Sequence, residues 1–144
     1  MTASRVDQPA PIVLRQATLA DSVAMWRVSS SEVLSPFAYA TVLRRLPRSC
    51  ECLVACADDV IVGFAVAYRS GPELVILDLQ LDRGEPVSRL FEVLHALTAW
   101  PSFAGARVIE VDEACAPDVR EAAAVLRGGP RAVRGDHGVT ELTG

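Results

Sequence analysis

Residues 73–100, with the sequence ELVILDLQL-DRGEP-VSRLFEVLHALTAW, carry the pattern that decides the fold. The apolar residues of 73–81 predict a strand, Asp82 to Pro86 predict a turn, and the spacing of apolar residues after Pro86 predicts a helix. The first backbone N–H groups of a helix have no acceptor within it and lie at the positive end of its dipole. This strand, loop and helix can therefore hold a phosphate or pyrophosphate group.

The other segments predict a single α/β domain with helices on both faces of a mixed, mostly antiparallel sheet. Strands are expected at residues 12–15, 50–56, 60–69, 73–81 and 105–114, and helices at 19–33, 36–46, 87–100 and 117–127. Because a helix separates the last two strands, the right-handed crossover rule makes these strands parallel neighbours. The three earlier strands are joined by short turns and should pair antiparallel.

The chain has 144 residues and a net charge of -4. We expect a flexible arm at residues 1–11, one domain at 12–129, and a tail or short final strand at 130–144. The negative charge argues against an extended surface for nucleic acid or for an anionic membrane. The sequence has neither a signal-peptide pattern nor an apolar run of about 20 residues, so we expect a cytoplasmic protein with a small-molecule partner.

Three of the four cysteines, Cys50, Cys52 and Cys56, are evenly spaced in one predicted strand. Even spacing places their side chains on one face of the sheet. Only His95 and His137 offer imidazole ligands elsewhere, so we expect buried, reduced cysteines and no metal site. A zinc site and disulfide bonds remain as alternatives.

Short motifs in this order resemble those of the GNAT N-acetyltransferases. Their cofactor loop, Gln/Arg-x-x-Gly-x-Gly/Ala, falls on Arg83, Pro86 and Ser88, with proline at a glycine position. From residue 15 to about 126 the chain is most similar to the diaminobutyrate acetyltransferases of ectoine synthesis. Residues 32–39 match their Asp-x-Asn-Ser-x-Tyr-x-Tyr motif, and further matches follow in order at 62–64, 67–69 and 82–84.

Departures from that family fall on its functional positions. The family's asparagine, first motif tyrosine and Trp-Gln pair correspond here to Leu34, Phe37 and Leu77-Asp78. The C-terminal hairpin that completes the family's sheet also looks shortened. Two alternatives therefore remain: an N-acetyltransferase, or a GNAT-fold module without catalysis that serves interaction or ligand sensing.

The resemblance implies that acetyl-CoA is the cosubstrate and that an amine attacks its thioester. Its thioester carbonyl would bind a main-chain amide of the segment from Leu79 to Leu81. Its pyrophosphate would bind backbone amides in the loop and first helical turn, with added charge from arginine. These cofactor-binding positions are Leu79, Leu81, Arg83, Gly84, Val87, Ser88 and Arg89. The alternative for this loop is an ordinary helix that begins with proline at its first position.

Four polar side chains are candidates for the acceptor side of the reaction. Asp78 would serve as catalytic base if burial raised its pKa, or would be an outward-facing residue of an alternating strand. Glu32 would bind a substrate ammonium, Tyr39 would orient the substrate, and Glu110 would lie near the amine. The implied substrate is a small amine, with 2,4-diaminobutyrate as first candidate, and the related enzymes imply a homodimer.

Overall fold

The computed structural model describes residues 10–29, 35–113, 115–126, 133–134 and 139–141. The strands are β1 (Val13–Gln16), β2 (Cys50–Ala57), β3 (Val60–Ser70), β4 (Glu73–Leu81), β5 (Val108–Val111), β6 (Val133–Arg134) and β7 (Val139–Glu141). The helices are the 3₁₀ turn η1 (Leu19–Asp21), α2 (Ser22–Ser29), α3 (Pro36–Arg45), α4 (Val87–Ala99) and α5 (Pro117–Leu126).

All seven strands form one sheet in the order β1-β2-β3-β4-β5-β7-β6. Every neighbouring pair is antiparallel except β4 and β5, which run parallel with Glu73 opposite Val108 and Ile76 opposite Val111. The crossover through α4 is the reason for this exception. The predicted mixed, mostly antiparallel sheet and its parallel pair are confirmed.

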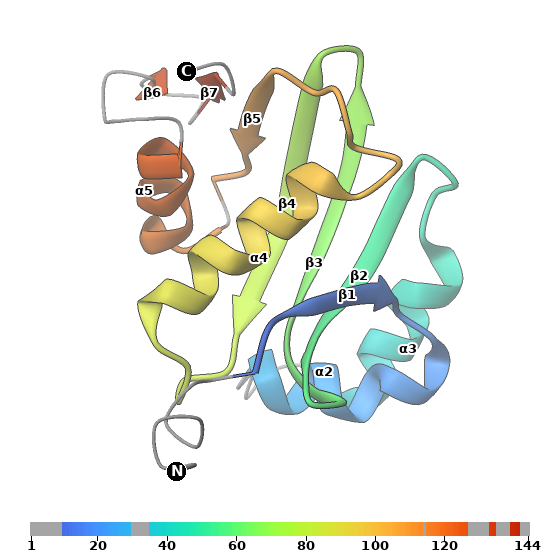
Figure 1. Cartoon of the computed structure of the whole chain (residues 1–144). Coiled ribbons are helices and arrows are strands. Elements are labelled where there is room, and N and C mark those ends of the chain that lie inside the picture. The colour runs from blue at the N-terminus through green and yellow to red at the C-terminus, as the bar shows by residue number, and fades with distance from the viewer. Residues whose placement is uncertain (1–9, 30–34, 114, 127–132, 135–138, 142–144) are drawn as a thin grey trace, which may run out of the picture.

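Helices cover both faces of the sheet (Figure 1). The face under α4 and α5 buries the larger apolar cluster, to which α4 contributes Leu90, Val93, Leu94 and Leu97. These four residues have the i, i+3, i+4, i+7 spacing of a single helical stripe. Leu94 and Leu97 are both 0% exposed, so the stripe predicted from the sequence is the buried side of α4.

The opposite face packs against α2 and α3. Its smaller cluster is made of Met25, Val28, Tyr39, Cys52, Val54, Cys56 and Phe64. The Tyr39 and Phe64 rings meet edge to face with centroids 5.7 Å apart. Cys52 and Cys56 therefore share one face and are buried, as predicted, whereas Cys50 is only partly buried and does not belong to this cluster. The four cysteines are free thiols.

One of the two helix starts before β2 agrees with the prediction and the other differs. α3 begins at Pro36 as expected, and the Ser35 Oγ caps it by accepting the Ala38 N–H at 3.4 Å. The helix predicted to begin at residue 19 starts instead with the 3₁₀ turn η1, and α2 begins only at Ser22. β1 is shifted by one residue from the predicted range. The remainder of the predicted first helix, with Glu32, lies outside the described residues.

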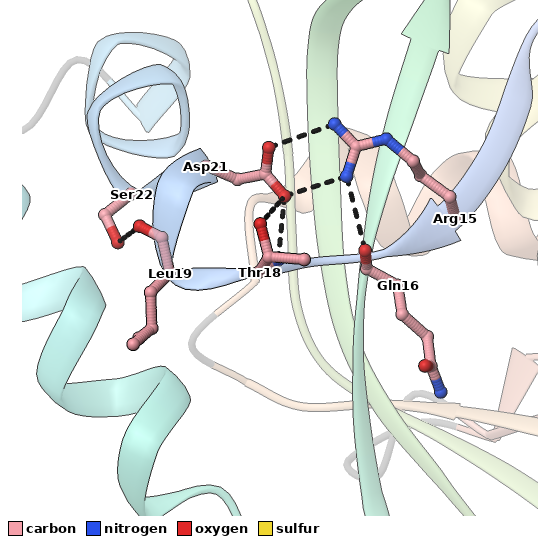
Figure 2. Close-up of polar contacts among 6 residues, drawn as sticks. All are labelled: Arg15, Gln16, Thr18, Leu19, Asp21 and Ser22. Atoms are coloured by element: carbon pink, nitrogen blue, oxygen red, sulfur yellow. Dashed lines mark hydrogen bonds and ion pairs between the residues drawn. The ribbon is translucent and has the colours of Figure 1, made fainter.

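An ion pair closes the turn between β1 and α2 (Figure 2). The Arg15 guanidinium donates to both carboxylate oxygens of Asp21, at 2.8 and 3.0 Å. The same carboxylate accepts from the Thr18 N–H at 2.7 Å and from its hydroxyl at 3.2 Å. These contacts hold the pKa of Asp21 below its usual value, with the Arg15 hydrogen bond as the largest cause.

We expect Asp21→Asn to lower the free energy of unfolding by about 1 kcal/mol at neutral pH, since Arg15 is half exposed and its contribution is screened. Because the pKa of Asp21 is lower in the folded protein than in the unfolded chain, its carboxylate stabilises the fold above the unfolded pKa of about 3.9. This contribution is lost as the pH falls through the folded-state pKa. Urea unfolding at several pH values would measure the difference, with the exposed turn variant Asp58→Asn as control. A deficit that persists in full at low pH would contradict the electrostatic cause.

At the C-terminus, two short strands extend the sheet beyond the expected tail or single strand. β7 pairs antiparallel with β5, through Val108 opposite Glu141, and β6 pairs with β7. Residues 130–144 have no clear periodicity, so the sequence did not predict this pairing.

Among the described residues, no helix has the length and apolar character needed to cross a bilayer.

Candidate functional site

β4 and β5 separate at the middle of the sheet. Their ladder ends where the Asp112 N–H donates to the Ile76 carbonyl at 2.9 Å. At the same level the register between β3 and β4 shifts, because Val66 pairs with Asp78 and Ala67 with Ile76, which leaves Leu77 as a bulge. Past this level no strand among the described residues pairs with β4 on its β5 side. We call the opening between the two strands the V-gap.

Beyond the bulge, the backbone of β4 alternates between β3 and the V-gap. The Asp82 N–H donates to the Val62 carbonyl at 2.8 Å, so the hydrogen-bonded pairs with β3 fall on Asp82, Gln80 and Asp78. The intervening residues, Leu79 and Leu81, therefore direct their amides away from β3. The Leu79 N–H is the first that faces the V-gap, at a position predicted to bind a thioester carbonyl.

Beside this segment lies a pocket of about 290 Å³ between β4 and the first turns of α4 and α5. We call it the α4/α5 pocket. It is lined by Leu79, Gln80, Leu81, Asp82, Arg83, Glu85, Pro86, Val87, Leu90, Ala116, Asp118 and Val119. Apolar side chains from β4 and both helices form its inner part, and the loop forms its mouth. Four of the predicted cofactor residues, Leu79, Leu81, Arg83 and Val87, thus meet at one pocket.

The first turn of α4 presents backbone donors toward this mouth. Pro86 is the N-cap, with extended backbone angles and no side-chain cap, so it is not the first helical residue as the ordinary-helix alternative assumed. Val87 and Ser88 follow as the first two helical residues, and their N–H groups have no acceptor within the helix. Gly84 stands in open space, with no atom within 4 Å of the position that a Cβ would take. Pro86 itself contributes no N–H.

The charges around the mouth are mostly negative. Among the lining residues, Asp82, Glu85 and Asp118 are acidic and Arg83 is the basic one. Arg83 is exposed. The second predicted arginine, Arg89, is instead buried.

The Arg89 guanidinium is held by partners within the protein. Its Nε lies 3.1 Å from Glu85 and its Nη1 lies 3.2 Å from Glu92, and Nη1 also donates to the Ala10 carbonyl. With a side-chain exposure of 5%, Arg89 ties the loop and the chain before β1 to α4. The spacing Glu85, Arg89, Glu92 is visible in the sequence and favours such i,i+4 and i,i+3 pairs.

Asp78 lies on the opposite face of β4 from Leu79, toward α2 and α3. Its Oδ1 accepts a hydrogen bond from Gln80 Nε2 at 3.1 Å. Burial raises the pKa of Asp78 above its usual value, while hydrogen bonds from the Gln80 side chain and the Leu79 amide lower it by less. The carboxylate is thus partly buried beside the V-gap, and it is not an outward-facing residue of an exposed strand.

The fold brings only some of the other residues predicted to bind the amine close to Asp78. Tyr39 is 7% exposed and packs on Phe64, whose strand position is opposite Gln80. Glu110 alternates with the core residues Ile109 and Val111, so it lies on the same face of the sheet as Asp78, opposite Val75. Glu32 lies outside the described residues.

Cys115 was not predicted as a site residue, yet it lies at the V-gap. Its Sγ is 3.8 Å from the Ile76 carbonyl. Its neighbour Ala116 lines the α4/α5 pocket. No local pattern marks Cys115, because this contact is with a residue 39 positions earlier in the chain.

A second pocket, of about 360 Å³, lies where β1 leaves the edge of β2. Its carboxylate, Glu51, accepts from Trp100 Nε1 at 2.9 Å and from Gln16 Nε2 at 3.3 Å. Burial raises the pKa of Glu51, but hydrogen bonds from Ser102, Trp100 and Gln16 outweigh it, so the pKa is lowered. These donors occupy the carboxylate, and we assign this pocket no chemistry.

Solved structures share the fold of this chain. An acetyltransferase from Thermus thermophilus aligns with a TM-score of 0.57 at 14% identity, over 70% of this chain and 75% of the other. A protein from Chromobacterium violaceum described as a probable acetyltransferase of the GNAT family gives 0.56 at 16% identity, over 83% and 70%. The chain has the GNAT fold.

An aminoglycoside 6'-acetyltransferase type Ii also aligns with this chain, with a TM-score of 0.52 at 15% identity, over 69% of this chain and 70% of the other. No protein-family model matches the sequence, and no curated protein matches it. The GNAT resemblance inferred from the sequence is thus confirmed for the fold. No comparison points to diaminobutyrate acetyltransferase.

Proposed function

We propose that this protein is an acetyl-CoA-dependent N-acetyltransferase that acts on a small amine. The observation that carries the proposal is the V-gap, where the Leu79 amide opens beside the α4/α5 pocket while Asp78 lies on the other face of the same strand. A thioester carbonyl needs a preorganised donor, and the attacking amine needs a proton acceptor. The Leu79 amide and the Asp78 carboxylate belong to two consecutive residues of β4.

The lining of the α4/α5 pocket fits the cofactor in its inner part. Leu79, Leu81 and Leu90 offer an apolar wall suited to the largely apolar arm of CoA. The N–H groups of Val87 and Ser88, with the positive end of the α4 dipole, would bind the pyrophosphate. Arg83 would add a charge-assisted contact. The bound cofactor would supply the activated acetyl group, and this chain would hold and orient it.

On the acceptor side, Asp78 would accept the proton that the ammonium must lose before its nitrogen can attack. Its raised pKa suits this role, because a base works best when its pKa approaches the working pH. Glu110 would attract the amine on the same face, Tyr39 would orient it, and Glu32 would pair with a second ammonium. A small diamino acid such as 2,4-diaminobutyrate is the first candidate, based on the motif at residues 32–39.

A second function is favoured by the loop itself. Asp82, Glu85 and Asp118 make the pocket mouth acidic, and Pro86 removes one amide from it. Both features oppose an anionic pyrophosphate. A GNAT-fold module that binds a ligand or partner without catalysis would need neither a strong pyrophosphate site nor a base.

Calorimetric titration with acetyl-CoA, followed by an assay of CoA release over a panel of small amines, separates the two functions. An acetyltransferase binds acetyl-CoA and releases CoA only when an amine is present. Diamino acids, simple amines and aminoglycosides should form the panel, with matched alcohols as controls. Binding without amine-dependent release, or no binding at all, would favour the non-catalytic module.

Pro86→Gly should tighten acetyl-CoA binding by about tenfold, because one restored amide contact to a charged oxygen is worth about 1.4 kcal/mol. Pro86 is exposed, so the change leaves the core intact. Pro86→Ala serves as a matched variant that also restores the N–H but keeps a Cβ. Unchanged affinity in both folded variants would show that the loop does not bind the pyrophosphate.

A further inference from the structure

Gly63 lies on β3 directly opposite Leu81, the last residue of β4. Its neighbours in β3 show on which face it lies. The Phe64 side chain belongs to the cluster against α2 and α3, and the Ala65 side chain belongs to the larger cluster under α4 and α5. Because side chains alternate along a strand, position 63 lies on the same face as Ala65. This buried position therefore belongs to the face that carries the α4/α5 pocket.

The space that a side chain would take at position 63 is already filled. A Cβ at Gly63 would lie 2.7 Å from the Leu81 Cδ2 and 2.7 Å from the Gln80 carbonyl oxygen. Carbon atoms pack at about 3.5 to 4.0 Å, so the Leu81 methyl group could not stay where it is. The Leu81 side chain thus lies across the backbone of β3, at a close approach that glycine permits.

Leu81 also forms part of the wall of the α4/α5 pocket. On the side away from β3, no strand among the described residues pairs with this end of β4. The Leu81 side chain therefore has β3 on one side and the pocket on the other. The backbone of β4 is held to β3 at this level, because the Asp82 N–H donates to the Val62 carbonyl at 2.8 Å. A Leu81 methyl group displaced from β3 would thus move into the pocket.

We propose that Gly63 is a positioning residue for the cofactor: it lets Leu81 lie against β3 and so keeps the α4/α5 pocket wide enough for the apolar arm of CoA. This inference rests on the proposed function, since the ligand that it concerns is acetyl-CoA. Gly63 is not among the residues that line the pocket, so its effect passes through Leu81. One methyl group added on β3 should therefore narrow a pocket that it does not itself line.

A double-mutant cycle on acetyl-CoA affinity tests this coupling, with the native protein, Gly63→Ala, Leu81→Ala and the double variant titrated by calorimetry. Gly63→Ala should weaken binding by about tenfold or more, because a methyl group inserted into a packed site displaces its neighbour. Leu81→Ala removes the side chain that would be displaced, so Gly63→Ala should weaken binding much less in that background. Ser70→Thr, which adds a methyl group at the exposed end of β3, is the matched control.

Two effects of Gly63→Ala have to be separated. The Leu81 methyl group is the end of a flexible side chain, whereas the Gln80 oxygen belongs to the backbone and can move only with β4. A shift of β4 would weaken binding equally with and without Leu81→Ala. Urea unfolding shows that each protein is folded, and an equal loss of affinity in both backgrounds would overturn the role of Gly63 proposed here.

The native protein gives a second readout that needs no variant. A nuclear Overhauser effect between a Leu81 methyl group and the Gly63 α protons is expected, and it should persist when acetyl-CoA binds. Loss of this signal on binding, or equal acetyl-CoA affinity of the native protein and Gly63→Ala, would overturn the inference alone. If the native protein shows the signal but does not bind acetyl-CoA, the proposed function is wrong, and this inference falls with it.

Discussion

Asp78→Asn is expected to lower amine-dependent CoA release by about 10² or more, because general-base catalysis contributes roughly 10² to 10⁴. The affinity for acetyl-CoA should change little, since Asp78 lies on the face of β4 opposite the Leu79 side of the pocket. Asparagine keeps an oxygen that can accept from Gln80, so the local geometry is preserved. Steady-state rates combined with calorimetry measure the two effects separately.

Asp78→Asn should lower turnover, but it should not lower the free energy of unfolding. A carboxyl whose pKa is raised in the folded state binds more protons there than in the unfolded chain, so its contribution to stability falls as pH rises from about 3.9 through the raised pKa. Asp78→Asn removes this term and should be at least as stable as the native protein at neutral pH. In the native protein, any amine-dependent turnover should rise with pH over the same range, as Asp78 loses its proton.

Two results would contradict this account of Asp78. Native turnover in the folded Asn variant would remove its catalytic role. A loss of turnover accompanied by a comparable loss of acetyl-CoA affinity would indicate a binding role. Glu73→Gln is the matched control, because Glu73 lies on the same strand but at its first residue, opposite Val108 and away from the V-gap.

Arg89→Ala is expected to lower the free energy of unfolding by about 2 to 3 kcal/mol. The Arg89 side chain is 5% exposed and pairs with two carboxylates, and it also donates to the Ala10 carbonyl. Its removal leaves the partly buried Glu85 carboxylate without a positively charged partner. Removing one partner of a buried pair costs about 3 to 5 kcal/mol, and the partial exposure of both glutamates reduces that figure. Urea unfolding measures the loss, with the exposed Arg107→Ala as control.

A double variant identifies the cause of this loss. Arg89→Met with Glu85→Gln replaces the pair by neutral side chains of similar length and should recover part of the stability lost in Arg89→Met alone, since no unpaired charge remains. Equal instability of the single and double variants would instead assign the effect of Arg89 to packing of its aliphatic chain. Because Arg89 pairs with Glu85 in the loop before α4, acetyl-CoA binding should weaken in Arg89→Met.

The secondary structure that positions the site could be predicted because its signals are local. In residues 73–100 the apolar run, the turn residues and the helical stripe each depend on neighbours a few positions apart, and the right-handed crossover then makes β4 and β5 parallel. The start of α3 at Pro36 and the shared face of Cys52 and Cys56 follow in the same way. The pairing of β7 with β5 could not be predicted, because residues 130–144 do not alternate between apolar and polar residues as a strand with one buried face would.

The chemistry of the site could be predicted less well from the sequence, because it depends on which residues contact one another across the sheet. Sequence alone determined the GNAT-like order of elements, the helix start that can bind an anion, and the position of Asp78 and Leu79 on one strand. Only the tertiary structure decided that Arg89 is paired with Glu85 and Glu92, that burial raises the pKa of Asp78, and that the Cys115 sulfur lies 3.8 Å from the Ile76 carbonyl. A local pattern fixes backbone conformation, whereas burial and long-range contacts exist only after the chain has packed.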